Sequence, residues 1–153
     1  MKKKLILITI LGALLLGGCT LRSEQTATIN NKLDLSNRGL KSVPEYVFKQ
    51  TNLEELNISN NQLTGAIQAE IRQLKNLKYL TASNNNLTGV PTEIGQLINL
   101  QVLDLSNNQL TGLPYELGNL QNLKTLNLSG NNYSKADLAV IKKKLPTNVN
   151  IIQ

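Results

Sequence analysis

One block of sequence recurs five times in this 153-residue chain, at a spacing of 23 or 24 residues. The anchor leucines of the five copies are Leu33, Leu56, Leu80, Leu103 and Leu126. Self-similarity at such a period is typical of a solenoid, in which each repeat buries its apolar residues only by stacking on its neighbours. Solenoids commonly work by presenting an extended surface. The repeat therefore predicts a binding protein and indicates where it binds, but does not identify the ligand.

The fourth copy, residues 99–121, shows the pattern most completely and reads NLQVLDLSNNQLTGLPYELGNLQ. Leu103 and Leu105 alternate with Asp104 and Ser106, as in a short strand with one buried face. The whole block resembles the leucine-rich repeat, L-x-x-L-x-L-x-x-N-x-L, in its 23-residue variety with a Leu-Pro in the second half. This resemblance implies an α/β solenoid: an arc with a short parallel sheet on its concave face and irregular, 3-10 or helical turns on its convex face.

Four asparagines occupy the same register in successive copies, and these are Asn61, Asn85, Asn108 and Asn131. The resemblance implies that their side chains bond backbone groups of neighbouring turns. Buried amides of this kind must be hydrogen-bonded, because an unpaired one would be costly. We therefore interpret the four asparagines as a structural ladder, although they look like a polar cluster.

Departures from the pattern locate the ends of the solenoid. In the first copy, Asn30 replaces a core leucine and Arg38 replaces the ladder asparagine, which suits an N-terminal cap exposed to water. The second copy has one extra residue within 65–69 and predicts a locally wider turn. The fifth copy drifts from the pattern, and there residues 135–144 predict a helix and residues 149–152 a final edge strand. These last two segments would form the C-terminal cap.

The first nineteen residues read as an export signal. Three lysines precede the apolar run 5–16, which is shorter than the about 20 residues that a membrane-spanning helix requires. The ending LGGC at 16–19 resembles the bacterial lipobox, which implies cleavage before Cys19 and a diacylglycerol on its sulfur. An ordinary signal peptide followed by an incidental cysteine is the alternative interpretation.

The chain therefore divides into a lipoprotein signal peptide (1–18), a lipidated cysteine with a short polar tether (19–28) and a leucine-rich-repeat domain (29–153). The domain has about five repeats, of which the first and last act as caps. Cys19 is the only cysteine, so the chain forms no internal disulfide. A diacylglyceryl group on this residue would anchor the protein stably to a membrane. Thr20 stands where an aspartate would resemble an inner-membrane retention signal, which favours the outer membrane or the cell surface.

The outward face of the predicted sheet carries two rows of side chains. The first row is Lys32, Glu55, Tyr79, Val102 and Thr125, and the second is Asp34, Asn57, Thr81, Asp104 and Asn127. A third row is serine in every copy and is interpreted as scaffold. Tyr79 and Val102 should be neighbours about 4.8 Å apart at the backbone, and an aromatic beside an aliphatic suits a contact hot spot. The predicted partner-binding residues are Tyr79, Val102, Glu55, Thr81, Asn57 and Asp104. The alternative is that singly exposed apolar residues carry no function.

Several functions are disfavoured by composition. The chain has no histidine, and its one thiol is the predicted lipid anchor, so the commonest general base and metal ligand are missing. Asp34 and Asp104 would lie about 14 Å apart, beyond the roughly 5–9.5 Å of glycosidase carboxylates. Asp34 and Glu55 would be closer, but on an open sheet that raises no pKa. We predict no catalysis, no cofactor and no metal.

The charge does not indicate a nucleic-acid partner. Three of the sixteen basic residues lie in the signal, which leaves thirteen against ten acidic residues, a net of about +3. The predicted function is non-enzymatic binding of a protein partner through the concave face by a monomeric, membrane-anchored lipoprotein. A structural envelope component that binds polysaccharide or peptidoglycan is the alternative. Sugar sites usually contain several aromatics in a row, and the predicted rows contain only Tyr79, which favours a protein partner.

Overall fold

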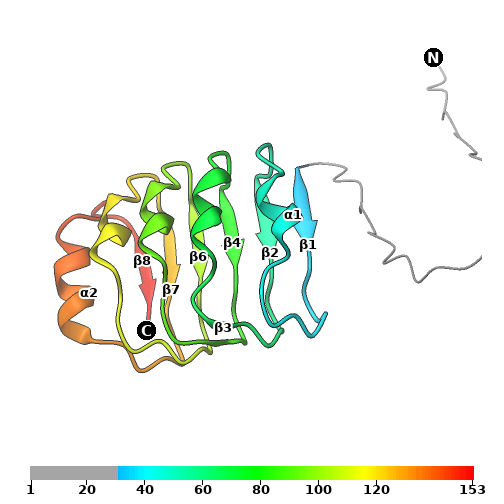
Figure 1. The fold of residues 1–153 in the computed structure, drawn as a ribbon. Coiled ribbons are helices and arrows are strands. Elements are labelled where there is room, and N and C mark those ends of the chain that lie inside the picture. Colours follow the sequence, from blue (N-terminus) through cyan, green and yellow to red (C-terminus); the bar gives the residue numbers. More distant parts are fainter. Residues whose placement is uncertain (1–30) are drawn as a thin grey trace, which may run out of the picture.

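A computed structural model describes residues 31–153, so the predicted signal peptide, Cys19, the tether and Asn30 lie outside the described residues. The described residues coil into a solenoid whose repeats follow one another along a single axis (Figure 1). One parallel sheet runs its length in the order β1-β2-β4-β6-β7-β8. Its strands are β1 (Lys32–Asp34), β2 (Glu55–Asn57), β4 (Tyr79–Thr81), β6 (Val102–Asp104), β7 (Thr125–Asn127) and β8 (Asn150–Ile152). The predicted fold class is confirmed.

The anchor leucines set the register of this sheet. Leu33 pairs with Leu56, Leu56 with Leu80, and so on through Leu103 and Leu126 to Ile151. All of these strands are three residues long and turn their flanking residues outward, while the central residue is buried in β1 to β7 and half-buried in β8. The nearly constant repeat length therefore aligns the central residues in one row, which is buried from Leu33 to Leu126.

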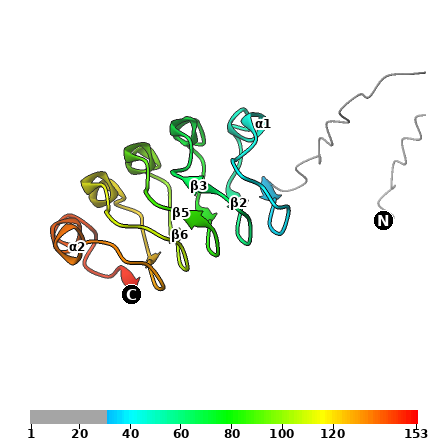
Figure 2. The same cartoon turned by 60° about the horizontal axis from the view of Figure 1, so that its bottom comes forward.

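Short helical turns line the other face of the solenoid (Figure 2). They are α1 (Glu45–Phe48), η1 (Ala69–Gln73), η2 (Thr92–Gln96), η3 (Tyr115–Asn119) and α2 (Lys135–Lys142). Pro44, Pro91 and Pro114 stand at the N-caps of α1, η2 and η3, with extended backbone. Proline fits this place because its fixed φ matches the turn and the position requires no N–H donor. The proline of the repeat therefore marks where each of these three turns begins.

A second, two-stranded parallel sheet joins the two faces of the solenoid, formed by β3 (Thr64–Gly65) and β5 (Asn86–Leu87). The extra residue of the second copy falls in this region. Gly65 has a φ of +69°, in the left-handed region that side chains disfavour, which explains a glycine here. At the ends of the main strands Asn60, Asn84 and Asn107 also have positive φ, between 53° and 55°. Asparagine tolerates that conformation better than most residues.

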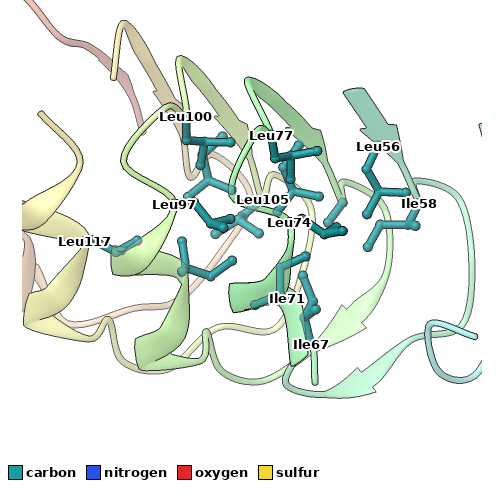
Figure 3. Packing of buried hydrophobic residues seen from close by; sticks show 14 of the residues in the cluster. Leu56, Ile58, Ile67, Ile71, Leu74, Leu77, Leu97, Leu100, Leu105 and Leu117 are labelled. Carbon is teal, nitrogen blue, oxygen red and sulfur yellow. The ribbon is translucent and has the colours of Figure 1, made fainter. Parts of the chain in front are cut away.

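The core is a continuous stack of leucine and isoleucine side chains between the sheet and the turns (Figure 3). Leu56 and Leu103 from the sheet and Leu74 and Leu97 from the turns are all 0% exposed. Burying one such side chain stabilises the fold by about 1.5–3 kcal/mol. Because each repeat contributes to the layers on both sides of it, the stability of the fold depends on neighbouring repeats being present.

The ends of the described solenoid follow the predicted caps with small differences. Arg38 is exposed at the N-terminal end, where its position faces solvent. The C-terminal helix α2 begins at Lys135 as predicted but ends at Lys142 rather than 144, and β8 begins at Asn150 rather than 149. The Ser134 hydroxyl caps α2 by accepting from the backbone N–H of Asp137, at 3.2 Å. Within residues 31–153, no helix is both long and apolar enough to cross a membrane.

Candidate binding surface

The two predicted rows lie side by side on the outward face of the sheet, which we call the concave face. Tyr79 pairs in register with Glu55 on one side and with Val102 on the other. The Tyr79 side chain is exposed (42%), Val102 is half-buried, and Thr81 is half-buried two residues along the same strand. The structure therefore brings together the aromatic and the aliphatic residue of the predicted contact pair.

Two ion pairs lie beside Tyr79, each joining neighbouring repeats. Lys32 Nζ is 2.6 Å from Glu55 Oε2, and Lys78 Nζ is 2.8 Å from Glu54 Oε2. The hydrogen bond and charge of Glu55 raise the pKa of Lys32 above its ordinary value. The Lys32 side chain is mostly exposed and the other three are half-buried, so solvent reaches both ion pairs and weakens them. A partner's charged group could therefore compete for Glu55 at little cost in stability.

Two residues predicted to bind a partner already bond within their own repeat. Asn57 Oδ1 accepts from the backbone N–H of Ser59 at 3.0 Å and from its hydroxyl at 2.6 Å. Asp104 Oδ1 accepts from the N–H and hydroxyl of Ser106 at 2.9 and 2.7 Å. These local bonds terminate the strands, so the second row is partly scaffold. The sequence shows this bonding pair as an Asp/Asn-x-Ser motif in four of the five copies. From the sequence, only the serines of this motif were assigned to the scaffold.

The same motif accounts for the one shifted carboxyl on this face. Asp34 Oδ1 accepts from the backbone N–H of Ser36 at 2.8 Å. This bond is the main cause that lowers the pKa of Asp34 below its ordinary value. Asp34 is therefore a fixed anion at neutral pH rather than a group able to hold a proton for catalysis.

The four aligned asparagines form the ladder that the resemblance implied. Each carboxamide oxygen accepts a backbone N–H of the preceding repeat, and each NH₂ donates to carbonyls of the preceding repeat and of its own repeat. Asn108, for example, accepts from Leu87 N–H and donates to the carbonyls of Ala82, Leu105 and Ser106, at 3.0–3.2 Å. Asn61, Asn85 and Asn108 are buried and Asn131 is half-buried, and the amide groups of all four are engaged in these backbone bonds.

A second asparagine ladder, which sequence reasoning missed, lies at the start of each repeat. Asn76 Nδ2 donates to Thr51 C=O, Asn99 Nδ2 to Lys75 C=O and Asn122 Nδ2 to Ile98 C=O, all at 2.8–2.9 Å. In the second copy Asn52 instead donates to the side chain of Asn31. An asparagine precedes the first leucine of copies two to five, so the period alone could have revealed this set.

Within 31–153, no three carboxylate, histidine or cysteine side chains cluster closely enough to hold a metal ion. Asp34 and Glu55 belong to adjacent strands, but Glu55 is paired with Lys32 and Asp34 is exposed.

The comparisons with known proteins agree with this geometry. The family described as leucine-rich repeat region matches residues 55–143, which is more than half of the chain. The chain therefore belongs to the leucine-rich-repeat family, whose domains are typically protein-binding and usually non-enzymatic. No curated protein matches the sequence.

Three solved structures illustrate the relationship. A leucine-rich-repeat protein of Leptospira interrogans is 42% identical, with a TM-score of 0.68 over 74% of this chain and 28% of that one. An internalin from Listeria monocytogenes is 26% identical, with a TM-score of 0.63 over 72% and 31%. The ectodomain of the Arabidopsis thaliana membrane receptor kinase GASSHO1/SCHENGEN3, in complex with Casparian strip integrity factor 2, is 34% identical, with a TM-score of 0.58 over 65% and 13%. The chain thus spans under a third of the length of each of these proteins.

Proposed function

We propose that this chain is a membrane-anchored lipoprotein that binds a protein partner, without catalysis, through its concave face. The observation that carries the proposal is the pairing in register of Tyr79 and Val102, in adjacent strands at the middle of that face. An aromatic and an aliphatic side chain on a rigid sheet bind with little loss of conformational freedom. The weak ion pairs of Glu54 and Glu55 add polar groups at the rim that a partner can reorganise.

The comparisons support the general class of this function. The Arabidopsis ectodomain is in complex with Casparian strip integrity factor 2, and leucine-rich-repeat domains typically bind proteins. The concave face of this chain has the composition that such contacts favour, since its first row has an apolar centre and charged residues at one end. The arc is short, so several copies on one membrane would strengthen an individually modest affinity.

The test is a pull-down with the mature domain, residues 20–153, from envelope extract and from host-cell lysate. The informative variant is Tyr79→Ala with Val102→Glu. Its matched control is Tyr115→Ala with Ile98→Glu, which makes the same kinds of change at exposed residues outside the concave face. We expect the parent and the control to capture the same partner and the concave-face variant, still folded by circular dichroism, to lose it.

Two results would contradict this proposal. If the concave-face variant captures the partner as well as the parent does, another surface is in use. If neither form captures a protein, the polysaccharide or peptidoglycan alternative becomes the better hypothesis, and binding to purified wall polymer would test it.

The anchor is proposed from the sequence at Cys19. Cys19→Ala should abolish retention of the domain on membranes, because a diacylglyceryl cysteine supplies the two acyl chains that stable attachment requires. The measurement is the fraction of protein in the membrane pellet after a high-salt wash, for the parent and for Cys19→Ala. A variant that remains in the washed pellet would show that the protein is held there by other means.

A further inference from the structure

The last strand of the sheet has an open hydrogen-bonding edge. Within residues 31–153, β8 pairs only with β7 (Figure 1). Asn150 N–H donates to Lys124 C=O and Ile152 C=O accepts from Leu128 N–H, both at 2.8 Å, so these two residues of β8 face β7. Alternate residues of a strand direct their backbone groups to opposite sides. The N–H and C=O of Ile151 therefore point to the open edge, away from β7.

A cleft of about 340 Å³ lies beside this edge. Its lining residues are Lys142, Leu145, Pro146, Thr147, Val149 and Ile151. Ile151 aligns with the buried anchor Leu126, and Val149 packs against the same core. Both are only half-buried because no further repeat among the described residues covers them. The volume is at the lower end of the range for ligand pockets, about 300–1,000 Å³. Leu145, Pro146, Val149 and Ile151 supply apolar walls, while polar atoms make up most of the exposed lining.

Lys142 is the charged residue of the cleft lining, and its neighbours in the sequence are basic. Lys142, Lys143 and Lys144 are exposed at the end of α2, and residues 138–153 contain no aspartate or glutamate. A second copy docked edge to edge by a twofold axis would bring two such lysine groups together, which like-charge repulsion disfavours. A partner with carboxylates beside an extended apolar stretch is complementary to this end of the solenoid.

We propose that the open edge of β8 docks an extended acidic segment of a partner protein, which adds to the sheet as a further strand. Its backbone bonds the N–H and C=O of Ile151, one or two aliphatic side chains enter the cleft, and its carboxylates lie near Lys142 and Lys143. Strand addition of this kind obtains affinity from the backbone and specificity from pockets for alternate side chains. This site is separate from the concave face.

The test uses the mature protein and a fluorescein-labelled peptide, Asp-Glu-Val-Thr-Val-Asp-Glu, in a fluorescence anisotropy titration. The matched peptide carries lysine at each acidic position. Ile151→Pro removes the N–H that faces the open edge without removing a bond to β7, and Ile151→Val is its control, with similar side-chain volume and the N–H intact. Circular dichroism checks that both variants are folded. A second variant, Lys142→Gln with Lys143→Gln, changes only exposed side chains.

We expect the acidic peptide to bind the parent and Ile151→Val alike, and the basic peptide not to bind. Ile151→Pro should weaken binding at least about tenfold, and the lysine variant several-fold with a flatter dependence on salt. If Ile151→Pro is unfolded, the lysine variant alone decides. The proposal is overturned if the acidic peptide does not bind below about 1 mM, if neither variant weakens it, or if the basic peptide binds equally well.

The concave-face variant, Tyr79→Ala with Val102→Glu, separates the two sites. It should bind the acidic peptide as tightly as the parent does, whatever it does to the partner in the pull-down. Loss of peptide binding in that variant would place the peptide on the concave face and overturn the edge site, while leaving the proposed function of the concave face intact.

Discussion

The two asparagines Asn61 and Asn108 are both 8% exposed, yet replacing them with alanine should not cost the same free energy of unfolding. The reason lies in the other bonds of their partners. Without Asn108, the carbonyls of Leu105 and Ala82 still accept from the ladder asparagines on either side. The carbonyl of Ser106 still accepts from a backbone N–H. Only the buried N–H of Leu87 loses its partner.

Asn61 has no such support, because the first repeat carries Arg38 in place of a ladder asparagine. Its oxygen accepts from the N–H groups of Arg38 and Leu40, and its NH₂ donates to the carbonyl of Leu35, at 2.9–3.0 Å. Within residues 31–153, no other hydrogen bond satisfies these three groups. Asn61→Ala therefore leaves three groups unpaired where Asn108→Ala leaves one.

The magnitudes follow from burial. A buried unpaired group costs about 1–3 kcal/mol. This cost applies to Leu87 N–H in Asn108→Ala and to Leu35 C=O in Asn61→Ala. The N–H groups of Arg38 and Leu40 are partly buried, so water can reach them, and each loses only a net hydrogen bond of about 0.5–1.5 kcal/mol. The side-chain volume removed is the same. Asn61→Ala should thus cost about 2–6 kcal/mol and Asn108→Ala about 1–3 kcal/mol.

Urea unfolding followed by circular dichroism measures both free energies. Gln62→Ala is the control, since this exposed side chain should change stability by no more than about 0.5 kcal/mol. Equal losses for the two asparagine variants, or a larger loss for Asn108→Ala, would refute the argument that shared acceptors protect the central positions of the ladder.

Two further changes test packing and pH dependence. Gly95→Ala should destabilise the domain by about 1–3 kcal/mol in the same urea assay, because its Cβ would lie within 3 Å of the Glu116 backbone. Gly89→Ala is the control and should not destabilise the domain, since its Cβ meets no atom within 4 Å. Equal losses of stability in the two variants would exclude a steric cause. The pKa of Asp34 is lowered by the Ser36 N–H, so its contribution to stability is present above the unfolded pKa near 3.8 and is lost as pH falls through the folded pKa. Asp34→Asn keeps the oxygen that accepts from the Ser36 N–H but does not titrate, so its urea midpoint should fall less than the parent's on acidification. Identical dependence of the two midpoints on pH would show that Asp34 does not contribute to the acid sensitivity of the fold.

The sequence predicted the solenoid, the register of the five repeat strands and the C-terminal cap because all of them depend on apolar spacing. Leucines at a fixed period can be buried in one way only, so Leu80 and Leu103 had to pair. Spacing does not reveal which polar side chains turn back to the backbone. For that reason the local bond of Asn57 to Ser59 and the second asparagine ladder, which includes Asn99, were missed. The binding roles of Tyr79 and its neighbours remain predictions.

The end of α2 illustrates a different limit. Residues 135–144 suit a helix by composition, but the observed α-helix ends at Lys142. A turn follows, and Leu145 is buried. The burial of Leu145 and the presence of Pro146 together determine where the helix ends. Local helix propensity does not show at which residue these two effects stop the helix. The open edge of β8 likewise depends on which strand has no neighbour, which only the assembled sheet shows.

Both asparagine ladders point the same way along the chain. Asn85 bonds back to Leu63 and Ile58, just as Asn99 bonds back to Lys75, so each repeat is completed by the one that follows it. A duplicated internal unit would find matching acceptors before it and matching donors after it. Gain or loss of whole 23-residue units in the gene could therefore change the length of the solenoid while the residues at its two ends stay the same.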